Sequence, residues 1–526
     1  MTKKILSFAA STLFLVGCGA GAGTPASQSP APTDGDTPTL ESTPTAGGEI
    51  VFAQASAPPT LDPHGTNDSV SNETMNQIFE TLTTFDGDGQ LIPWLATSFE
   101  AITDTTWEFV LRQGVSFHDG DPFDSYAVYR SLNRVLDPTL ASPRHFIVNM
   151  IAQVQIVDTY TLHIETYYPF SPLPAHLAHL VGGIISPSSL DRELAGGYTI
   201  SEFPVGTGPF TFVSHTPGEE VRMARNDNYW GDAPAIETLR FVVVPEPSTR
   251  FNMLLTGEAH VTRPSAVDAS LIRDDANLSL MEIPSSRLNY IGFNTLRPPF
   301  DDIRVRQAIA MVTDLDAIVE AIDGMGIPAV GPLSPIVTGA PSDLAPITGT
   351  VEDALALLAE AGFPDGFSTV ISLGANRPLE EPLTAQIFQA NLASIGITAS
   401  IQEIEWGAYL DYTGAGNHEI FILGWTTVTG DADYGLFPLF HTDQAGIPGN
   451  RTFYSNPRVD YLLTAARQTA DQALRNELYA EASQILAYEV PMIYTFYNTF
   501  MFATHGISGL FADFNGTPSF RQVVLD

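Results

Sequence analysis

Two small groups of residues have types and spacings that could perform chemistry. Asp431 and Asp433 stand two positions apart, and paired carboxylates can act as general acid and base or hold a cation. His176 and His179 have the i,i+3 spacing that places two imidazoles on one side of a helix, where they could bind a metal ion. Neither pair is decisive, because acids are abundant in this sequence and one histidine pair is a weak metal signal.

The motifs of common catalytic sites are missing from the sequence. It contains no Gly-x-Ser-x-Gly elbow, no His-Glu-x-x-His pair, no Walker loop and no dinucleotide-binding fingerprint after a strand. His118-Asp119-Gly120 holds acid–base groups, but its place after an expected strand favours a turn. The single cysteine excludes an intrachain disulfide and a cysteine-based zinc or iron–sulfur site. We therefore expect no enzyme, no cofactor and no metal.

Apolar patterns predict the strands that would position such groups. Residues 49–53 read as a buried strand, and 239–244 as a continuous apolar strand that ends at a proline. Apolar and polar residues alternate over 106–111 and 160–165, which is typical of strands with one buried face. Residues 290–294 resemble a further strand. Strands are thus expected mainly in the first 300 residues.

Helices are predicted mainly in the second half of the chain. Thr350 can cap a helix with Asp353 in the third position of a capping box, and Gly362 ends that helix. A second helix is expected over 383–395, and one long or two shorter helices over 461–488. Strands and helices alternate between 350 and 425. This alternation favours an α/β region with parallel strands.

Composition bounds the class of protein. A chain of 526 residues is too long for one core, so two or three lobes are expected. The hydrophobic content of 44% is typical of a globular protein. No apolar run reaches the roughly 18–20 residues that a membrane-spanning helix needs. The formal net charge is −37, from 60 acids and 23 bases, which excludes nucleic-acid binding by a broad basic face. Both lysines lie in the first four residues.

The N-terminus has the pattern of an export signal. A basic start is followed by an apolar stretch from Ile5 to Gly17, which has the length of a signal-peptide core. The sequence Leu15-Val16-Gly17-Cys18 resembles the bacterial lipoprotein box. We therefore predict a signal peptide over 1–17, lipidation of Cys18 and attachment to the outer face of a bacterial membrane. Residues 18–48, rich in Gly, Ala, Ser, Thr and Pro, are predicted to be a disordered tether.

Several segments in one order resemble a single family, the family 5 extracellular solute-binding proteins of ABC importers, which include dipeptide-, oligopeptide-, glutathione- and nickel-binding members. The resemblance runs from about residue 48 to the C-terminus. The segments that carry it are Thr60-Leu61-Asp62-Pro63, Ile78-Phe79-Glu80-Thr81-Leu82, Asp104 to Phe109, Leu111 to Gly120, Val205 to Phe210, Asn228-Tyr229-Trp230-Gly231, Arg304 to Ile309, Ala359 to Phe367 and Leu423-Gly424-Trp425.

The resemblance implies an α/β, periplasmic-binding-protein-like fold of two lobes (type II, cluster C) with an additional small domain and a hinge. Lobe I would comprise 49–80, 200–285 and 492–526, the extra domain 81–199, and lobe II 286–491. Such proteins close around a solute and deliver it, chemically unaltered, to ABC permease subunits. We expect a monomer with a peptide-like small ligand.

The same resemblance implies how a peptide would be held. In dipeptide-binding relatives an arginine in a similar stretch pairs with the ligand carboxylate, and Arg377 matches it. Trp425 would supply an aromatic wall. Val428 stands where many relatives have an acid for the peptide amine, so Asp431 or Asp433 could replace that acid. The further predicted ligand-binding residues are Thr426, Thr427, Asn289, Tyr290, Trp406 and Tyr409.

Two alternatives remain open from the sequence. The same fold could bind an oligosaccharide, because Trp406, Trp425 and Tyr409 could stack on sugar rings. An extracellular hydrolase using Asp431 and Asp433 is the alternative from another class.

Overall fold

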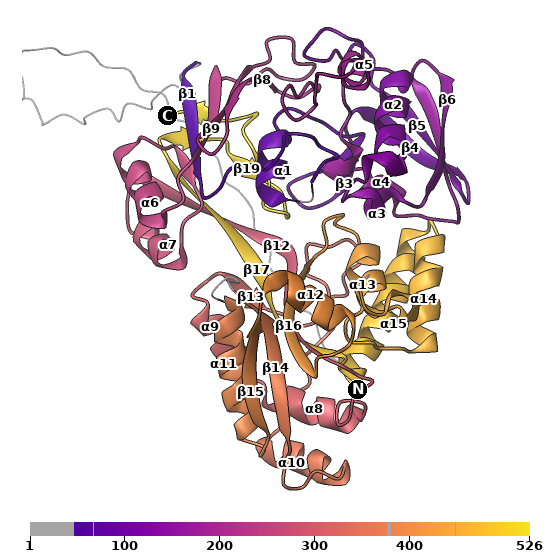
Figure 1. Cartoon of the computed structure of the whole chain (residues 1–526), viewed down its shortest axis with the longest axis vertical. Helices are drawn as coiled ribbons and strands as arrows, with labels where there is room; N and C mark the ends of the chain where they lie inside the picture. The colour runs from indigo at the N-terminus through magenta and orange to yellow at the C-terminus, as the bar shows by residue number, and fades with distance from the viewer. Residues whose placement is uncertain (1–46, 67, 376–379, 448) are drawn as a thin grey trace, which may run out of the picture. The chain divides into compact units, whose positions relative to one another are not determined.

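The computed structural model describes residues 47–526 except 67, 376–379 and 448 (Figure 1). Its first part builds one end of a large mixed sheet. Here β1 pairs in parallel with β10 and β11, and β10, β9 and β8 follow as an antiparallel meander. These elements are β1 (Glu49–Gln54), β8 (Phe210–Thr216), β9 (Glu220–Arg225), β10 (Thr238–Val243), β11 (Val261–Thr262), α1 (Ser69–Met75), α6 (Pro247–Thr256) and α7 (Ala266–Arg273).

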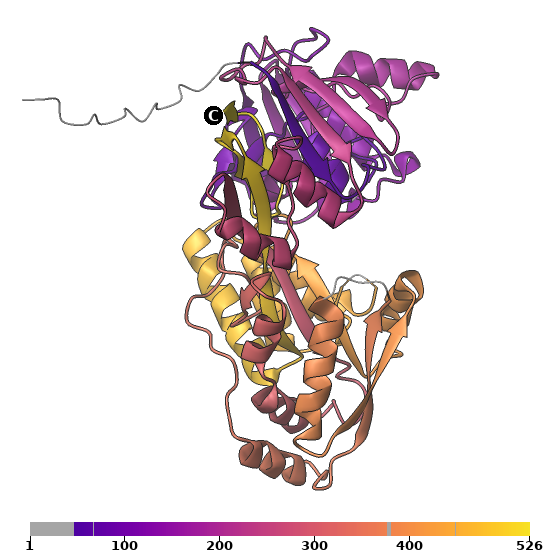
Figure 2. The same ribbon diagram turned by 90° about the vertical axis from the view of Figure 1, so that its left-hand side faces the viewer.

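Two long antiparallel strands connect the two ends of this sheet. β12 (Leu278–Phe293) and β17 (Met492–His505) pair with each other, and β17 also pairs with β11 (Figure 1). The register shifts between Pro284 and Leu288 and again between Asn289 and Tyr290, which interrupts the ladder at two points along the pair. Figure 2 shows the same pair from the side. The sequence had indicated only a short strand at 290–294, and residues 290–293 of it form the buried end of β12.

The other end of the sheet contains parallel strands covered by helices. β14 pairs in parallel with β15 and β16, which confirms the α/β pattern predicted for 350–425. β16 then pairs with β12 in antiparallel fashion. The elements are β13 (Gly326–Pro328), β14 (Ser368–Gly374), β15 (Thr398–Ile404), β16 (Ile420–Thr426), α8 (Ile303–Val312), α9 (Leu315–Ala321), α10 (Val351–Glu360), α11 (Glu380–Ala393), α12 (Trp406–Gly414), α13 (Ala432–Phe440), α14 (Pro457–Gln468) and α15 (Gln472–Glu489).

A separate four-stranded antiparallel sheet, in the order β4-β5-β7-β6, lies between β3 and β8 in the chain. Its inward residues form one apolar cluster with the neighbouring helices, and Phe109, Leu162 and Ile164 at its centre are fully buried. The elements are β2 (Thr83–Phe85), β3 (Leu91–Pro93), β4 (Ala96–Thr103), β5 (Thr106–Leu111), β6 (Ile151–Asp158), β7 (Thr161–Thr166), α2 (Ser125–Leu136), α3 (His145–Val148), α4 (Leu173–His176) and α5 (Pro187–Ala195).

The chain ends in short hairpins after β17. β18 (Ile507–Ser508) pairs with β21 (Val524–Leu525), and β19 (Phe511–Ala512) pairs with β20 (Pro518–Ser519). Phe520 and Val523 pack into the apolar cluster of β1 and β10. Among the described residues, no helix has the length and apolar character needed to cross a bilayer.

Local sequence signals explain several element boundaries. Both bonds of the predicted capping box between Thr350 and Asp353 are present at the start of α10. The region 461–488 contains two helices, α14 and α15, separated at Thr469. Asp471 begins the second of them by accepting bonds from the backbone N–H groups of Ala473 and Leu474.

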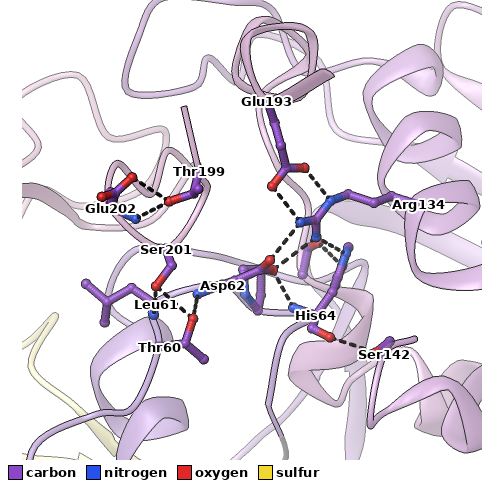
Figure 3. Close-up of polar contacts among 12 residues, drawn as sticks. Thr60, Leu61, Asp62, His64, Arg134, Ser142, Glu193, Thr199, Ser201 and Glu202 are labelled. Atoms are coloured by element: carbon purple, nitrogen blue, oxygen red, sulfur yellow. Dashed lines mark hydrogen bonds and ion pairs between the residues drawn. The ribbon is translucent and has the colours of Figure 1, made fainter. Parts of the chain in front are cut away.

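The segment after β1 is fixed by a largely buried polar network (Figure 3). Arg134 on α2 donates to both carboxylate oxygens of Asp62, at 3.0 and 2.7 Å, and to both oxygens of Glu193 on α5. His64, which is fully buried, lies beside them. Burial acts to raise the pKa of Asp62, but the hydrogen bonds and charge of Arg134 outweigh it and hold that pKa below its ordinary value. The Thr60-Leu61-Asp62-Pro63 motif thus joins the β1 end of the large sheet to α2 and α5.

Candidate functional site

A cavity of about 640 Å³ is lined by segments that lie far apart in the sequence. One wall comes from α1 and the residues that follow it, and another from the turn after α4 and the β2–β3 hairpin. A third comes from the C-terminal hairpin region 511–522, and a fourth from the end of β16 and the loop that follows it. Volumes of this size hold small organic ligands. These segments together therefore form a candidate ligand site.

Trp425 and Thr426, two of the predicted ligand-binding residues, line this cavity at the end of β16. The indole N–H of Trp425 donates to the Tyr434 carbonyl at 2.9 Å, and the two rings stack with centroids 5.4 Å apart. The indole therefore offers a ring face, while its one donor is used internally. Val428 also lines the cavity, whereas Thr427 is buried beside it.

Glu80 holds an aromatic wall of the cavity in place. One carboxylate oxygen accepts from the Trp94 indole at 2.9 Å and the Tyr229 hydroxyl at 2.7 Å. The other accepts from the Trp230 indole at 2.8 Å and the Thr207 hydroxyl at 2.7 Å. Burial raises the pKa of Glu80, and the four donated bonds oppose that rise. Trp94 and Tyr229 face the cavity with Glu80, so one carboxylate positions two rings of its lining.

The charged lining is predominantly acidic. Glu73, Asp86 and Asp513 line the cavity in addition to Glu80, and Arg521 is the arginine of the described lining. Burial raises the pKa of Asp513 to about 6, although it accepts bonds from the backbone N–H groups of Asn515 and Thr517. Glu73 pairs with Arg263 at 2.8 Å. The described lining therefore holds more acidic than basic side chains.

Asp431 and Asp433 are held by buried arginines. The Arg475 guanidinium on α15 lies 2.6 Å from an Asp431 oxygen. Arg467 on α14 donates to both oxygens of Asp433, each at 2.9 Å. Neither aspartate lies in the lining of the cavity. Their role as ligand contacts or catalytic carboxylates stays a prediction, and these ion pairs account for both acids as structural groups.

Four other predicted contacts lie on β12 and α12, away from this lining. Tyr290 is 1% exposed and Tyr409 is fully buried, with its hydroxyl donating to the Ile422 carbonyl at 2.6 Å. Asn289 donates to the Asn498 side chain, and Trp406 packs against the same core as Tyr409. That these four residues contact a ligand stays a prediction. Their burial and internal contacts do not support it. The stacked sugar-binding wall also lacks support, since of its three rings only Trp425 lines the cavity.

Arg377 lies outside the described residues, so its pairing with a ligand carboxylate stays a prediction. The predicted signal peptide, 1–17, and residues 18–46 of the predicted tether 18–48, with Cys18, also lie outside them.

The histidine pair has separate structural surroundings. The Nδ1 of His176 hydrogen-bonds the Ile147 carbonyl at 2.7 Å, and the Nδ1 of His179 accepts from the Val181 N–H at 3.1 Å. In the part of the chain that the structure describes, no group of three or more His, Cys, Asp or Glu side chains could hold a metal ion.

Sequence reasoning missed Glu80, Glu73, Asp513 and His179 as lining residues. Glu80 lies in one of the segments that carry the family resemblance, Ile78-Phe79-Glu80-Thr81-Leu82. An acid among apolar neighbours is the sequence signal that could have indicated a buried functional carboxylate there. Asp513 gave no signal, because its place in the cavity depends on contacts between distant segments.

Comparison with known proteins identifies the family. Residues 90–446 match the model of the bacterial extracellular solute-binding proteins, family 5. That match covers more than half of the chain. The chain belongs to this family.

Relatives and solved structures agree with that assignment. The glutathione-binding protein GsiB of Pectobacterium atrosepticum is 33% identical over 458 residues, which cover 85% of this chain and 88% of the relative. GsiB of Escherichia coli is also 33% identical, over 456 residues. The structure of HbpA2 from Haemophilus parasuis has a TM-score of 0.84 at 32% identity, covering 91% of this chain and all of that one.

A periplasmic binding protein with a bound peptide is also similar. DppA from Helicobacter pylori, in complex with the peptide STSA, has a TM-score of 0.75 at 28% identity, and the match covers 91% of this chain and 98% of that one. The predicted fold class, a periplasmic-binding-protein-like α/β fold, is thereby confirmed. The predicted boundaries of the lobes and of the extra domain stay a prediction.

Proposed function

We propose that this protein is the substrate-binding component of an ABC importer and captures a peptide-like solute, a short peptide or a glutathione-like molecule, in the cavity around Trp425. The observation that carries the proposal is that cavity, which is lined by segments distant in the sequence and combines aromatic rings with polar groups. The similar GsiB proteins are named for glutathione, and the similar DppA structure holds a peptide.

The proposed mode of action is reversible binding without chemistry. β12 and β17 would act as the hinge, because they are the long strands that connect the two ends of the sheet. A ligand that contacts residues on both sides of the hinge stabilises the closed form only by its greater affinity for that form. The closed form would dock on permease subunits at the outer face of a bacterial membrane, to which Cys18 would anchor a monomer.

Ligand-induced thermal shift tests the proposal. A bound peptide at 100 times its dissociation constant adds about 2.7 kcal/mol to the free energy of unfolding. Tripeptides, glutathione and maltotriose should be compared at equal concentration, with Trp425→Ala measured beside the unaltered protein. We expect a shift with a peptide-like solute, reduced by Trp425→Ala. A shift with the sugar alone, or none with any peptide or with glutathione, would contradict the proposed substrate class.

A further inference from the structure

Helix α1 turns a polar side toward the ligand cavity. The residues of α1 and its C-terminal cap that line the cavity are spaced i, i+3, i+4 and i+7, as one side of a helix requires: Ser69, Asn72, Glu73 and Asn76. Met75, on another side of the helix, packs into the apolar cluster of β1 and β10. Glu73 is already paired with Arg263. The two asparagine amides are therefore the neutral polar groups that this wall offers beside the Ser69 hydroxyl.

The amide of Asn72 has a fixed orientation. Its side-chain oxygen accepts a hydrogen bond from the guanidinium of Arg144. Because a guanidinium can only donate, the Asn72 oxygen must face Arg144, and the NH₂ group must point the other way. Among the described residues, Nδ2 of Asn72 has no hydrogen-bond partner, yet it is not one of the buried polar atoms that lack a partner. The NH₂ group is therefore accessible, on a residue that lines the cavity.

Arg144 is a buried cation that forms no ion pair with a described carboxylate. It is fully buried, and its guanidinium also donates to the Pro63 carbonyl at 2.9 Å. Burial lowers the pKa of Arg144 to about 10, against the more distant charges of Asp62 and Asp68, so the group stays protonated at pH 7.5. An unpaired buried cation is costly and depends on its few acceptors. Flipping the Asn72 amide would set two donors against each other, so Arg144 holds it in one orientation.

We propose that Asn72 is a specificity-determining residue of the cavity and that Arg144 is its positioning residue, which fixes the Asn72 amide so that the NH₂ group donates to an oxygen atom of the solute. That oxygen belongs to a peptide carbonyl or to a carboxylate. This inference rests on the proposed function and adds a named contact to it. The side chain of Asn76 makes no hydrogen bond to the described residues, so it can present either its oxygen or its NH₂ group. The wall therefore demands an acceptor at Asn72 and is tolerant at Asn76.

Two substitutions of Asn72 separate a contact with the solute from the contact with Arg144. Asn72→Asp gives the buried guanidinium a carboxylate partner, so this variant should melt at a higher temperature than the unaltered protein, although it has no donor for the solute. Asn72→Ala removes acceptor and donor together and should melt at a lower temperature. Asn76→Asp is the matched control. It adds the same charge near the C-terminal end of α1, where no guanidinium is bound, and should not raise the melting temperature.

Binding of tri-alanine, tri-alanine amide and glutathione is measured by isothermal titration calorimetry at pH 7.5. We expect Asn72→Asp and Asn72→Ala each to weaken binding about 5- to 50-fold, although they change the melting temperature in opposite directions. A merely structural role would weaken binding only in the less stable variant. The two peptides identify the acceptor. A greater loss for tri-alanine than for its amide in Asn72→Asp indicates the terminal carboxylate, and equal losses indicate a carbonyl.

The outcomes distinguish this inference from the proposed function. Unchanged affinity in either Asn72 variant, for every probe that the unaltered protein binds, would overturn the contact with the solute. A melting temperature of Asn72→Asp at or below that of the unaltered protein would overturn the positioning by Arg144. Either result leaves solute binding intact. If the unaltered protein binds none of the three probes, both the proposed function and this inference fail.

Discussion

Replacing Glu80 by glutamine exchanges one carboxylate oxygen for an NH₂ group. The substitution tests whether the carboxylate positions the aromatic side chains in the wall of the cavity. The two indole N–H groups of Trp94 and Trp230 donate to different oxygens of the carboxylate. A glutamine amide has one acceptor oxygen, so one indole must face an NH₂ group, and an indole nitrogen can only donate. The hydroxyls of Tyr229 and Thr207 can rotate, but the orphaned indole cannot adapt.

The expected loss of stability follows from these contacts. An unsatisfied buried donor costs about 1–3 kcal/mol, and the remaining bonds lose the strength that a charged acceptor gives them. Removal of a buried charge offsets part of this, since burial raises the pKa of Glu80 and so marks the ionised form as costly. We expect Glu80→Gln to lower the free energy of unfolding by about 2 kcal/mol.

Urea denaturation followed by near-ultraviolet circular dichroism measures this change, because the signal comes from the immobilised tryptophans. The matched control is Glu165→Gln, the same substitution at an exposed position of β7, which should change stability by less than about 0.5 kcal/mol. Peptide affinity should fall in Glu80→Gln and stay unchanged in the control. Equal unfolding midpoints for the two variants would refute the account of Glu80 as the residue that positions the aromatic wall.

Four further expectations concern other charged groups and the anchor. Arg134→Met should lower the free energy of unfolding at pH 7.5 by about 3–5 kcal/mol in urea denaturation, because it leaves buried Asp62 unpaired; since Asp62 has a lowered pKa, the stabilisation is present above the pKa of the unfolded chain, so the deficit should shrink as the pH falls toward 3. Asp513 has a pKa raised from 3.8 to about 6, so its ionisation lowers the free energy of unfolding as the pH rises through that value. Asp513→Asn removes this ionisation and should therefore stabilise the ligand-free protein at pH 7.5 by at most about 3 kcal/mol in the same assay. Arg377→Ala should weaken binding of a peptide with a free carboxylate by about 2–5 kcal/mol in calorimetry and leave its C-terminal amide unaffected. Cys18→Ala should move the protein from the membrane fraction to the soluble fraction of cells that export it.

The sequence predicted those features that depend on neighbours in the chain. The capping box at Thr350 is a contact over three residues, and its signal is complete within one helical turn. The strand at 106–111 shows the alternation that one buried face requires, and β5 indeed buries every second residue. Such features are visible in sequence because their partners lie nearby in it.

The candidate site was less predictable, since its contacts join distant residues. Asp431 and Asp433 were visible as a pair, but the arginines that bind them lie on α14 and α15. The donors to Glu80 come from Trp94, Thr207, Tyr229 and Trp230, and no spacing rule links these positions. His179 was noticed only for its spacing from His176. Its place in the cavity lining depends on contacts between distant segments, and the Val181 N–H, which donates to Nδ1, fixes the tautomer of its ring.

Native mass spectrometry of the purified protein mixed with a set of short peptides tests the central claim most directly. The account predicts a one-to-one complex whose added mass equals that of an intact peptide, and the same peptide should be released unaltered after hours of incubation. Shortened peptides in solution, or a protein that acquires no peptide mass at any concentration, would contradict a receptor that binds its solute reversibly and leaves it whole.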